Sequence, residues 1–386
     1  MGQSWIADEL AAIAAAGRLR RRPVVEGRSG RTIRLGEGAP KGRLINWAGN
    51  DYLGLSRDLR VRNAAQREAR RCGPGAGAAR LLSGGLRLHR RFEERLAGWL
   101  GREDALLTPS GYQGNLALLG AIAGDGDLVI LDRLGHASLY DGARLCGAEV
   151  VRFLHNDPAD LERQLAKPAR RRIVCVESVY SMDGDEAPLR DLRAACDRHG
   201  ALLVVDEAHA LGVLGPEGRG LCAELGVAPD AWTATCSKSL TAQGGLLAAD
   251  RDLVELVVNR GRAGIYSTAL APAAAGAAEA ALGLLHERPD LGRRLCERSL
   301  DLRGRLRAVG ANVPEGRTPI IPILVGDEGS TLDLANRLRG HGHHAPAIRP
   351  PTVPPGGCRL RLSLSLGHRD KDLRLLVEAV RTCLAG

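Results

Sequence analysis

The sequence is poor in lysine, in aromatic residues and in long apolar runs. Only four of its 54 basic residues are lysines, and aromatic residues make up 3% of the chain. A nucleic-acid surface needs basic residues interleaved with stacking rings, so the shortage of rings argues against one despite the net charge of +9. The best apolar stretch, residues 269–285, is interrupted by Pro272, Gly276, Glu279 and Gly283, whereas a bilayer span needs about 18 apolar residues. We therefore expect neither a nucleic-acid partner nor a membrane partner.

Cysteine is present but lacks the spacing of a metal or disulfide site. The nine cysteines are an odd number without a CxxC pair, and several, such as Cys175, lie in apolar runs. The N-terminal residues include Asp8 and Glu9 and lack a charged and then apolar leader. These features predict reduced, buried thiols and a cytoplasmic location. The histidines within residues 341–344 have no companion cysteines or acids, so we interpret them as a solvated loop and expect no metal.

Short apolar runs alternate with helical patterns from about residue 45 onward. Continuous runs separated by helices are typical of parallel strands buried on both faces, which predicts an α/β fold with a mainly parallel sheet in a large domain. The expected strands cover residues 105–107, 128–131, 150–154, 173–176, 202–205, 232–235 and 245–248, and a helix is expected over 115–122.

The pattern changes beyond about residue 270. Helical patterns over 272–285, 291–309 and 331–340 surround apolar residues 320–325, and strict alternation over 359–366 predicts a half-buried antiparallel strand with its leucines inside and its Arg and Ser residues outside. These features indicate a smaller α+β domain. The expected divisions are residues 1–45 (a helix and a hairpin), 46–270 (the large domain) and 271–386 (the small domain).

Among the few lysines, Lys238 stands alone in a run of Cys, Ser, Thr and Leu. Arginine stays protonated, whereas a lysine amine can lose its proton and form an imine with a carbonyl. An apolar run over 201–205 ends in Asp206, so an acid follows one buried strand and the lysine follows the next. Pyridoxal phosphate requires this pair, because the acid keeps its pyridine nitrogen protonated and the lysine holds its aldehyde as a Schiff base. We predict that cofactor; a surface lysine and a helix-capping acid are the alternative.

A phosphate site is predicted where a strand gives way to a helix at Ser110, Gly111 and Tyr112. The exposed amides at the N-terminus of a helix favour an anion, and Gly111 allows close approach. A plain loop with a serine cap is the alternative. Thr235, three residues before Lys238, could offer the same phosphate a hydroxyl.

Three further side chains complete the predicted ring site. His136 follows a strand and could stack on one face of a pyridine ring whose other face meets the lysine. His209 and Ser181 are candidates for hydrogen bonds to the ring hydroxyl. Each of these is alternatively an ordinary capped or solvated side chain, but together they would surround one flat heteroaromatic anion.

Four motifs run nearly from one end of the chain to the other. They are Asn50–Ser56, Ser181–Asp185, Asp206–His209 and Ile348–Pro354. On these motifs the chain resembles the α-oxoamine synthases of the fold-type-I pyridoxal phosphate superfamily. The resemblance implies a homodimer with two active sites at the subunit interface, in which Ser267 or Thr268 reaches the phosphate of the neighbouring subunit.

The resemblance also implies substrates and their contacts. The implied reaction is a decarboxylative condensation of L-alanine with a pimeloyl thioester of coenzyme A or acyl carrier protein, which releases CO2 and 8-amino-7-oxononanoate. Arg361 is similar to the arginine that holds the amino-acid carboxylate. The implied substrate contacts are Arg20 or Arg21, Asn50, His136, Arg349, Thr352 and Arg361, and the implied catalytic residues are Lys238, His136, Asp206 and His209.

Two alternatives to this reaction remain. One is a sister α-oxoamine synthase that uses glycine or another acyl thioester. The other is a non-catalytic partner subunit of the same fold. Such a subunit normally lacks the lysine, so Lys238 argues against it.

Overall fold

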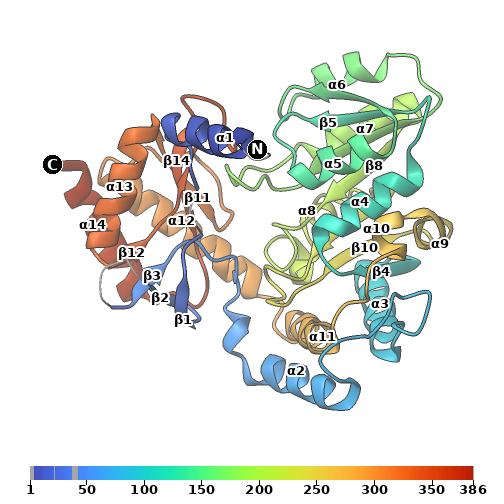
Figure 1. Cartoon of the computed structure of the whole chain (residues 1–386), viewed down its shortest axis with the longest axis horizontal. Coiled ribbons are helices and arrows are strands. Elements are labelled where there is room, and N and C mark those ends of the chain that lie inside the picture. Colours follow the sequence, from blue (N-terminus) through green and yellow to red (C-terminus); the bar gives the residue numbers. More distant parts are fainter. Residues whose placement is uncertain (1–3, 21, 37–41, 386) are drawn as a thin grey trace.

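A seven-stranded sheet forms the centre of the larger half of the molecule, in a computed structural model that describes residues 4–20, 22–36 and 42–385 (Figure 1). The strands follow the order β4-β10-β9-β8-β7-β5-β6. Their bounds are β4 Asp104–Thr108, β5 Leu128–Asp132, β6 Glu149–Phe153, β7 Arg172–Glu177, β8 Leu202–Asp206, β9 Ala231–Thr235 and β10 Gly245–Ala249. Every predicted strand of the large domain is present, which confirms the mainly parallel α/β sheet.

β10 departs from the predicted parallel arrangement. It runs antiparallel to both of its neighbours, β9 and β4, whereas the pairs from β9 through β6 are parallel. Only residues 236–244 connect β9 to β10, and a crossover between parallel strands needs about a dozen residues or more. The chain therefore turns back directly, and Lys238 lies in this turn.

The sheet is buried on both faces, as predicted. Leu128 and Ile130 of β5 belong to an apolar cluster with residues of α3, α6 and α7, whereas Val129 and Leu131 belong to a second cluster with residues of α4, α5 and α9. Both faces of one strand thus carry apolar side chains, which explains the continuous apolar runs. The helices of this half are α3 Arg87–Leu100, α4 Gly111–Ile122, α5 Ala137–Leu145, α6 Pro158–Leu165, α7 Leu189–His199, α8 Leu221–Leu225, α9 Arg251–Arg260 and α10 Arg262–Ile265, with the 3-10 turn η2 Pro216–Gly218.

The smaller half combines the two ends of the chain (Figure 1). One sheet has the order β11-β14-β13, and a second joins the N-terminal strands β1, β2 and β3 to β12. The strands are β1 Val25–Ser29, β2 Thr32–Leu35, β3 Leu44–Asn46, β11 Ile320–Gly326, β12 His343–His344, β13 Ala347–Ile348 and β14 Cys358–Ser363. The helices are α1 Ser4–Ala15, α12 Leu291–Ala308, α13 Glu328–Gly340 and α14 Asp370–Ala385, while η1 Leu55–Arg57, α2 Leu59–Cys72 and α11 Pro272–Glu287 lie between the halves in the sequence.

The expectation that β14 is half-buried is wrong. All six of its residues are buried, including Arg359 and Arg361. The strand is antiparallel, as predicted, but its polar face meets the loop of residues 181–186 from the larger half, where Arg361 Nε donates to the Ser181 carbonyl oxygen at 2.5 Å. Alternation of polar and apolar residues therefore marks a contact between the halves here, not a solvent-facing surface.

The interpretation of residues 341–344 as a solvated loop holds for His341, which is exposed in a turn, but is wrong for His343. His343 lies on β12 and is 2% exposed, and Trp47 Nε1 donates to its Nδ1 at 3.0 Å. His368 stacks on the same tryptophan with ring centroids 4.1 Å apart. No local pattern indicates this cluster, because strand pairing between β3 and β12 joins residues about 300 positions apart.

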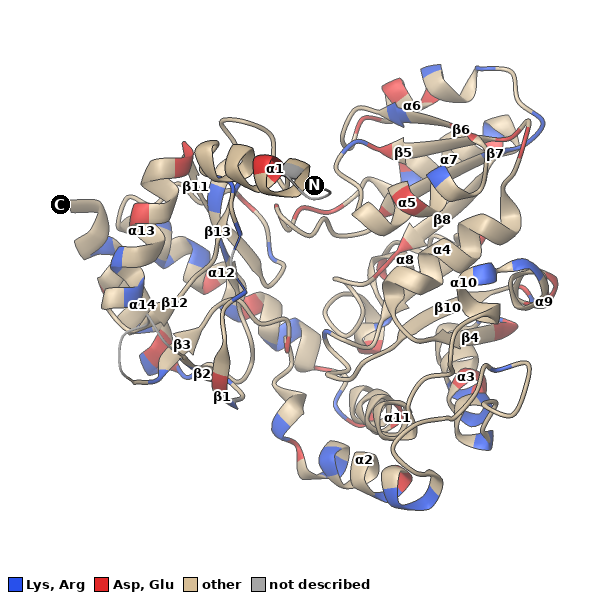
Figure 2. Ribbon diagram, viewed as in Figure 1, with Lys and Arg blue, Asp and Glu red and all other residues tan. Residues whose placement is uncertain are grey.

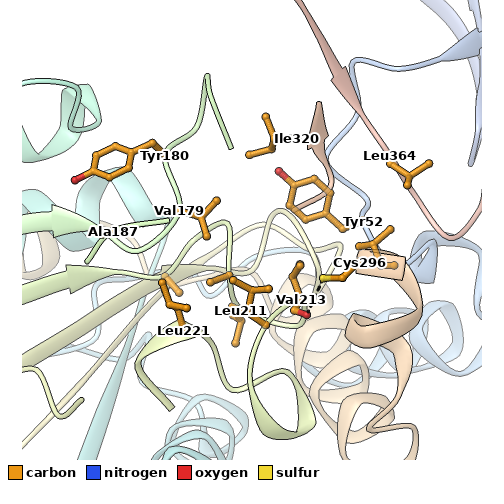
Figure 3. Close-up of a cluster of buried hydrophobic side chains, with 14 of the residues drawn as sticks. Tyr52, Val179, Tyr180, Ala187, Leu211, Val213, Leu221, Cys296, Ile320 and Leu364 are labelled. Atoms are coloured by element: carbon orange, nitrogen blue, oxygen red, sulfur yellow. Dashed lines mark hydrogen bonds between the residues drawn. The ribbon is translucent and has the colours of Figure 1, made fainter. Parts of the chain in front are cut away.

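One apolar cluster extends across both halves. Figure 3 shows Val179 and Leu211 of the larger half near Tyr52, Ile320 and Leu364, and all five residues belong to that cluster. Shared apolar burial of this kind holds the two halves together.

The surface carries charges of both signs over both halves (Figure 2). All nine cysteines are free and seven are buried, which matches the predicted buried thiols. Among the helices of the described residues, none has both the length and the apolar character of a membrane span.

Candidate active site

The carboxyl ends of β8 and β9 bring Asp206 and Lys238 to one edge of the sheet, because parallel neighbours end on the same side. Asp206 is the last residue of β8 and is 7% exposed. Its Oδ2 accepts a hydrogen bond from Asn115 Nδ2 at 2.8 Å, and its Oδ1 accepts one from the Ala208 amide at 2.9 Å. These two donors fix the orientation of a buried acid.

Lys238 follows β9 in the turn toward β10. Burial lowers the pKa of Lys238 to about 8, because desolvation of the ammonium outweighs the attraction of Asp206. A lower pKa gives more neutral amine near pH 7, and the neutral amine is the form that attacks a carbonyl or accepts a proton.

Glu177 is a second acid at this edge, and sequence reasoning missed it. It ends β7 directly opposite Asp206 in the strand register and is buried. Its Oε1 has no hydrogen-bond partner among the described residues, and burial followed by the charge of Asp206 raises its pKa well above the ordinary value. A neutral acid thus lies beside Asp206. The signal for it, an acid ending an apolar strand, was the same one that identified Asp206.

His136 is joined to Asp206 through two further polar side chains. Its Nδ1 accepts from the Ser138 amide at 3.2 Å and pairs with Ser138 Oγ at 2.7 Å. Asn115 Nδ2 donates to Ser138 Oγ at 2.9 Å as well as to Asp206. Since Nδ1 is an acceptor, the ring carries its proton on Nε2. The ring is exposed at the start of α5, with the ring of Tyr112 edge-on at 6.0 Å.

The predicted phosphate site is a helix N-terminus beside a threonine. Helix α4 begins at Gly111, four residues before the expected start, because Ser110 Oγ accepts from the Gln113 amide at 3.2 Å and caps it. A Cβ atom on Gly111 would lie 3.1 Å from Thr235 Cβ, so a larger residue would crowd this site. Thr235 Oγ1 is 2.8 Å from Ser237 Oγ. Helix amides and two hydroxyls therefore meet where the sequence predicted an anion.

Ser267 lies beside the start of α4 in the same chain. Gln113 Nε2 donates to Ser267 Oγ at 2.9 Å, and Thr268 is exposed and forms a β-bridge with Ala79. The predicted contact of either residue with the phosphate of a neighbouring subunit stays a prediction.

His209, Tyr52 and Arg361 close another side of the site. Tyr52 OH lies 2.7 Å from His209 Nδ1, and Arg361 Nη1 donates to Asn50 Oδ1 at 3.3 Å. Burial, reinforced by the positive charge of Lys238, lowers the pKa of His209 far below its usual value, and burial raises the pKa of Tyr52. A neutral imidazole that accepts from the tyrosine keeps its own proton on Nε2, where it can be donated to a ligand. The Ser181 carbonyl oxygen accepts from Arg361, and the predicted bond between Ser181 and the ring hydroxyl stays a prediction.

The remaining predicted substrate residues form a separate group in the smaller half. Arg20 Nη2 donates to Thr352 Oγ1 at 3.2 Å, and Arg349 Nη1 donates to the Gly17 carbonyl oxygen at 2.9 Å. These bonds tie the N-terminal segment to the loop that contains both Arg349 and Thr352. Arg21 lies outside the described residues.

The site has acids and histidines but no set of metal ligands. Within residues 4–20, 22–36 and 42–385, no group of three or more His, Cys, Asp or Glu side chains could hold a metal ion. The arrangement brings together helix amides beside two hydroxyls, a lysine with a lowered pKa, a buried acid and a buried arginine.

Comparison with known proteins identifies the family. The aminotransferase class I and II family profile matches residues 42–380. The chain belongs to this family. Among its curated relatives, the 8-amino-7-oxononanoate synthase of Anaeromyxobacter dehalogenans strain 2CP-1 is 46% identical over 94% of this chain and 91% of the relative. The enzyme of the same name from Klebsiella pneumoniae is 42% identical over 94% and 93%.

Solved structures agree with this aminotransferase-family assignment. Sphingomonas wittichii serine palmitoyltransferase has a TM-score of 0.91 at 31% identity, covering 98% of this chain and 96% of that one. Another serine palmitoyltransferase, described with pyridoxal phosphate as an internal aldimine, has a TM-score of 0.91 at 29% identity over 99% and 97%. These relatives confirm the predicted resemblance to the α-oxoamine synthases.

Sequence reasoning missed three further residues of this aminotransferase-family site. Asn115 and Ser138 are single polar residues in helices, and no local pattern distinguishes them from solvated ones. Tyr52 lies within the motif Asn50–Ser56, but its bond to His209 spans 157 positions and became visible only in the fold.

Proposed function

We propose that this protein is an 8-amino-7-oxononanoate synthase, which condenses L-alanine with a pimeloyl thioester and releases CO2 and the free carrier thiol. The observation that carries the proposal is the placement of Lys238 and Asp206 at one sheet edge, in a chain whose relatives of that name are 38–46% identical. A non-catalytic subunit would not need a lysine with a pKa of about 8 at this edge.

The site residues fit pyridoxal phosphate. The amides of residues 110–112, with the Thr235 hydroxyl, match a phosphate. Thr235 leaves little room for a side chain at Gly111, which suits close approach of an anion to the backbone. Lys238 matches the aldehyde, and Asp206 matches the pyridine nitrogen. When bound, the cofactor supplies an electron sink for the charge left at the α-carbon of an amino acid.

Each residue of the site has a definite task in this proposal. Asp206, oriented by Asn115, holds a proton at the ring nitrogen. His136 covers one ring face with its exposed side, and His209 donates its Nε2 proton to the ring hydroxyl, as Ser181 was also predicted to do. Arg361 binds the carboxylate of the amino acid. Lys238 Nζ, once free, removes the α-proton and later returns one.

The loop of residues 349–354 and Arg361 are proposed to select the substrates. Pro350 and Pro351 fix the backbone of this loop, and Arg20 donates to Thr352 within it. We propose that this group, with Asn50 and Arg349, selects alanine and an acyl chain of about five methylenes with a distal carboxyl or its ester. One methylene is worth about 1–3 kcal/mol in an apolar site, so neighbouring chain lengths should react within roughly 10- to 200-fold.

A substrate panel tests the proposal. Carrier release would be measured for alanine against glycine and for pimeloyl against acetyl, succinyl and palmitoyl donors, each on coenzyme A and on acyl carrier protein. We expect alanine with pimeloyl to be the best pair and acetyl to be very poor. Preference for another amino acid with palmitoyl would instead favour a sister activity, which the likeness to serine palmitoyltransferase makes the second candidate.

A homodimer in the cytoplasm completes the proposal. Exposed Leu81, Leu82 and Tyr266, with relative exposures of 56%, 79% and 73%, support a subunit contact near Ser267 and Thr268. Nine free cysteines suit a reducing compartment. Light scattering of the purified protein checks the dimer: a mass of one chain at micromolar concentration would contradict it.

A further inference from the structure

His155 lies between two carboxylates, outside the residues assigned above. Its Nδ1 is 2.9 Å from Asp132 Oδ1, and its Nε2 is 2.7 Å from Asp185 Oδ2. An ionised carboxylate can only accept hydrogen bonds, so both ring nitrogens must donate. The geometry therefore requires a positively charged imidazolium at this position.

The first carboxylate fixes the turn that leads to His136. Asp132 ends β5, and its Oδ1 also accepts from the Leu134 amide at 2.8 Å. Its Oδ2 accepts from the Asn156 amide at 3.0 Å. This acid thus holds the backbone two residues before His136 as well as the segment that contains His155.

The second carboxylate belongs to the loop that receives the arginine of the smaller half. Asp185 Oδ2 also accepts from Asn156 Nδ2 at 2.8 Å. Four residues earlier, the Ser181 carbonyl oxygen accepts from Arg361. The loop of residues 181–186 is therefore held by His155 and Asn156 on one side and by Arg361 on the other.

The same loop has little freedom to adjust. Gly184 has φ of 71°, and a Cβ atom there would lie 2.5 Å from the Ile320 carbonyl oxygen. Thr318 Oγ1 donates to the Gly184 carbonyl oxygen at 2.7 Å. A loop packed this closely transmits a shift at Asp185 to Ser181, because it cannot absorb the shift internally.

We propose that His155 is a positioning residue that links the His136 turn to the 181–186 loop and so sets the place of Arg361 for the amino-acid carboxylate. The inference rests on the proposed function for the role of Arg361. His155 itself touches neither substrate nor cofactor. Its cation joins the two loops that contribute opposite parts of the site.

The groups around His155 favour its charged form. Burial lowers the pKa of His155, but hydrogen bonds from its ring to Asp132 and Asp185 outweigh burial and raise the pKa to about 9. The ring of Tyr180 lies edge-on with centroids 4.4 Å apart, and Asp160 of α6 accepts from the neighbouring Leu154 amide. The charged groups that shift this pKa are both acids, so the link should persist through neutral pH and weaken above about pH 9.

The test compares the holoenzyme with its His155→Gln variant. The dissociation constant of L-alanine is measured from the change in the absorption of the bound cofactor between pH 7 and pH 10. We expect it to rise roughly 10- to 100-fold in the variant at pH 7, as for a misplaced positioning group. The ratio of the two constants cancels the titration of alanine and Lys238, which both proteins share. This ratio should fall toward one as pH passes about 9.

His199→Gln is the matched control, since His199 Nε2 lies 2.7 Å from Glu162 Oε2 away from the site; it should leave the alanine constant unchanged. A ratio near one at pH 7, or one that is the same at pH 7 and pH 10, overturns the proposal. If His155→Gln does not fold, Asp185→Asn is tested in its place. Loss of one of the two carboxylates should shift the alkaline decrease in affinity for alanine to lower pH than in the wild type. A decrease at the same pH overturns the proposal. If the wild type binds glycine or serine but not alanine, the proposed function fails, and the same ratios measured with that amino acid still test His155.

Discussion

Each half of the molecule contains a buried cluster of titratable side chains, and the two clusters differ in how fully their hydrogen bonds are satisfied. In the smaller half, His368 Nδ1 accepts from the Ser365 amide at 3.1 Å and its Nε2 lies 3.0 Å from the Asn46 carbonyl oxygen, so this imidazole is neutral and fully bonded. At the edge of the large sheet, Glu177 has one oxygen without a hydrogen-bond partner in the described part of the chain, and Lys238 has a lowered pKa. Buried groups whose hydrogen bonds are satisfied stabilise a fold, whereas an acid with an unpartnered oxygen beside a lysine with a lowered pKa is typical of a reactive site.

The largest expected effect is that of replacing Lys238, which should lower turnover but not stability. We expect Lys238→Ala to lose at least about 10³-fold in turnover, because it removes the group that bonds to the cofactor and moves the proton. The visible band of lysine-bound cofactor, which borohydride fixes to the wild type, should be absent, while the thermal midpoint stays close to that of the wild type. A borohydride-stable adduct in the variant would show that another amine holds the cofactor.

Asp206→Asn should lose on the order of 10²-fold or more in turnover with the fold retained. A neutral amide cannot keep the pyridine nitrogen protonated, and its single oxygen can accept from only one of the two donors, Asn115 Nδ2 and the Ala208 amide. Steady-state rates and circular dichroism measure the two sides of this prediction. Near-normal turnover in this variant would mean that Asp206 is a structural cap. The polar groups at the edge of the large sheet would then only stabilise the fold, as the cluster of Trp47, His343 and His368 does in the smaller half.

Acid should destabilise the buried cluster of Trp47, His343 and His368 in the smaller half. Burial lowers the pKa of His343 and of His368 to about 4. The histidines of an unfolded chain bind protons at a higher pH than these buried rings do. The contribution of the two neutral rings to the free energy of unfolding is therefore complete above about pH 6.5 and is lost as the pH falls toward 4. By pH 5 each ring should account for about 2 kcal/mol of lost stability. Urea unfolding at pH 7 and pH 5 should show a smaller loss in His368→Gln than in the wild type, and equal losses would contradict the assignment.

The smallest expected effect is at Glu177. Because its raised pKa keeps this acid neutral, Glu177→Gln preserves both shape and charge, and turnover should stay within about threefold of the wild type. Comparison of this variant with Asp206→Asn tests whether Glu177 and Asp206, which lie opposite each other on adjacent strands, differ in their effect on turnover. A loss near 10²-fold would mean that Glu177 is ionised or moves protons.

Local pattern was enough to place the candidate reactive groups at one sheet edge, but it did not show the contacts between them. Lys238, Asp206 and the helix start at Ser110 follow strand ends, and strand ends can be recognised from apolar runs. Asn115, Ser138 and His155 act through contacts between separate elements, for which a single sequence has no periodic signal. The reversed direction of β10 followed from a connection too short to cross over, and the length of 236–244 could have predicted it. The buried arginines of β14 broke the rule that polar residues of an alternating strand face water.

The lowered pKa of Lys238 also makes this side chain a target for selective chemical labelling. At pH 7 a lysine with a pKa of about 8 exposes about two orders of magnitude more free amine than one at the reference value. The chain has only three other lysines, so peptide mapping can assign each modified position without ambiguity. An amine-selective acylating reagent should therefore label Lys238 in protein stripped of cofactor and spare it after reconstitution. Because lysine is scarce in this chain, the extent of labelling at Lys238 measures the fraction of sites that lack the cofactor.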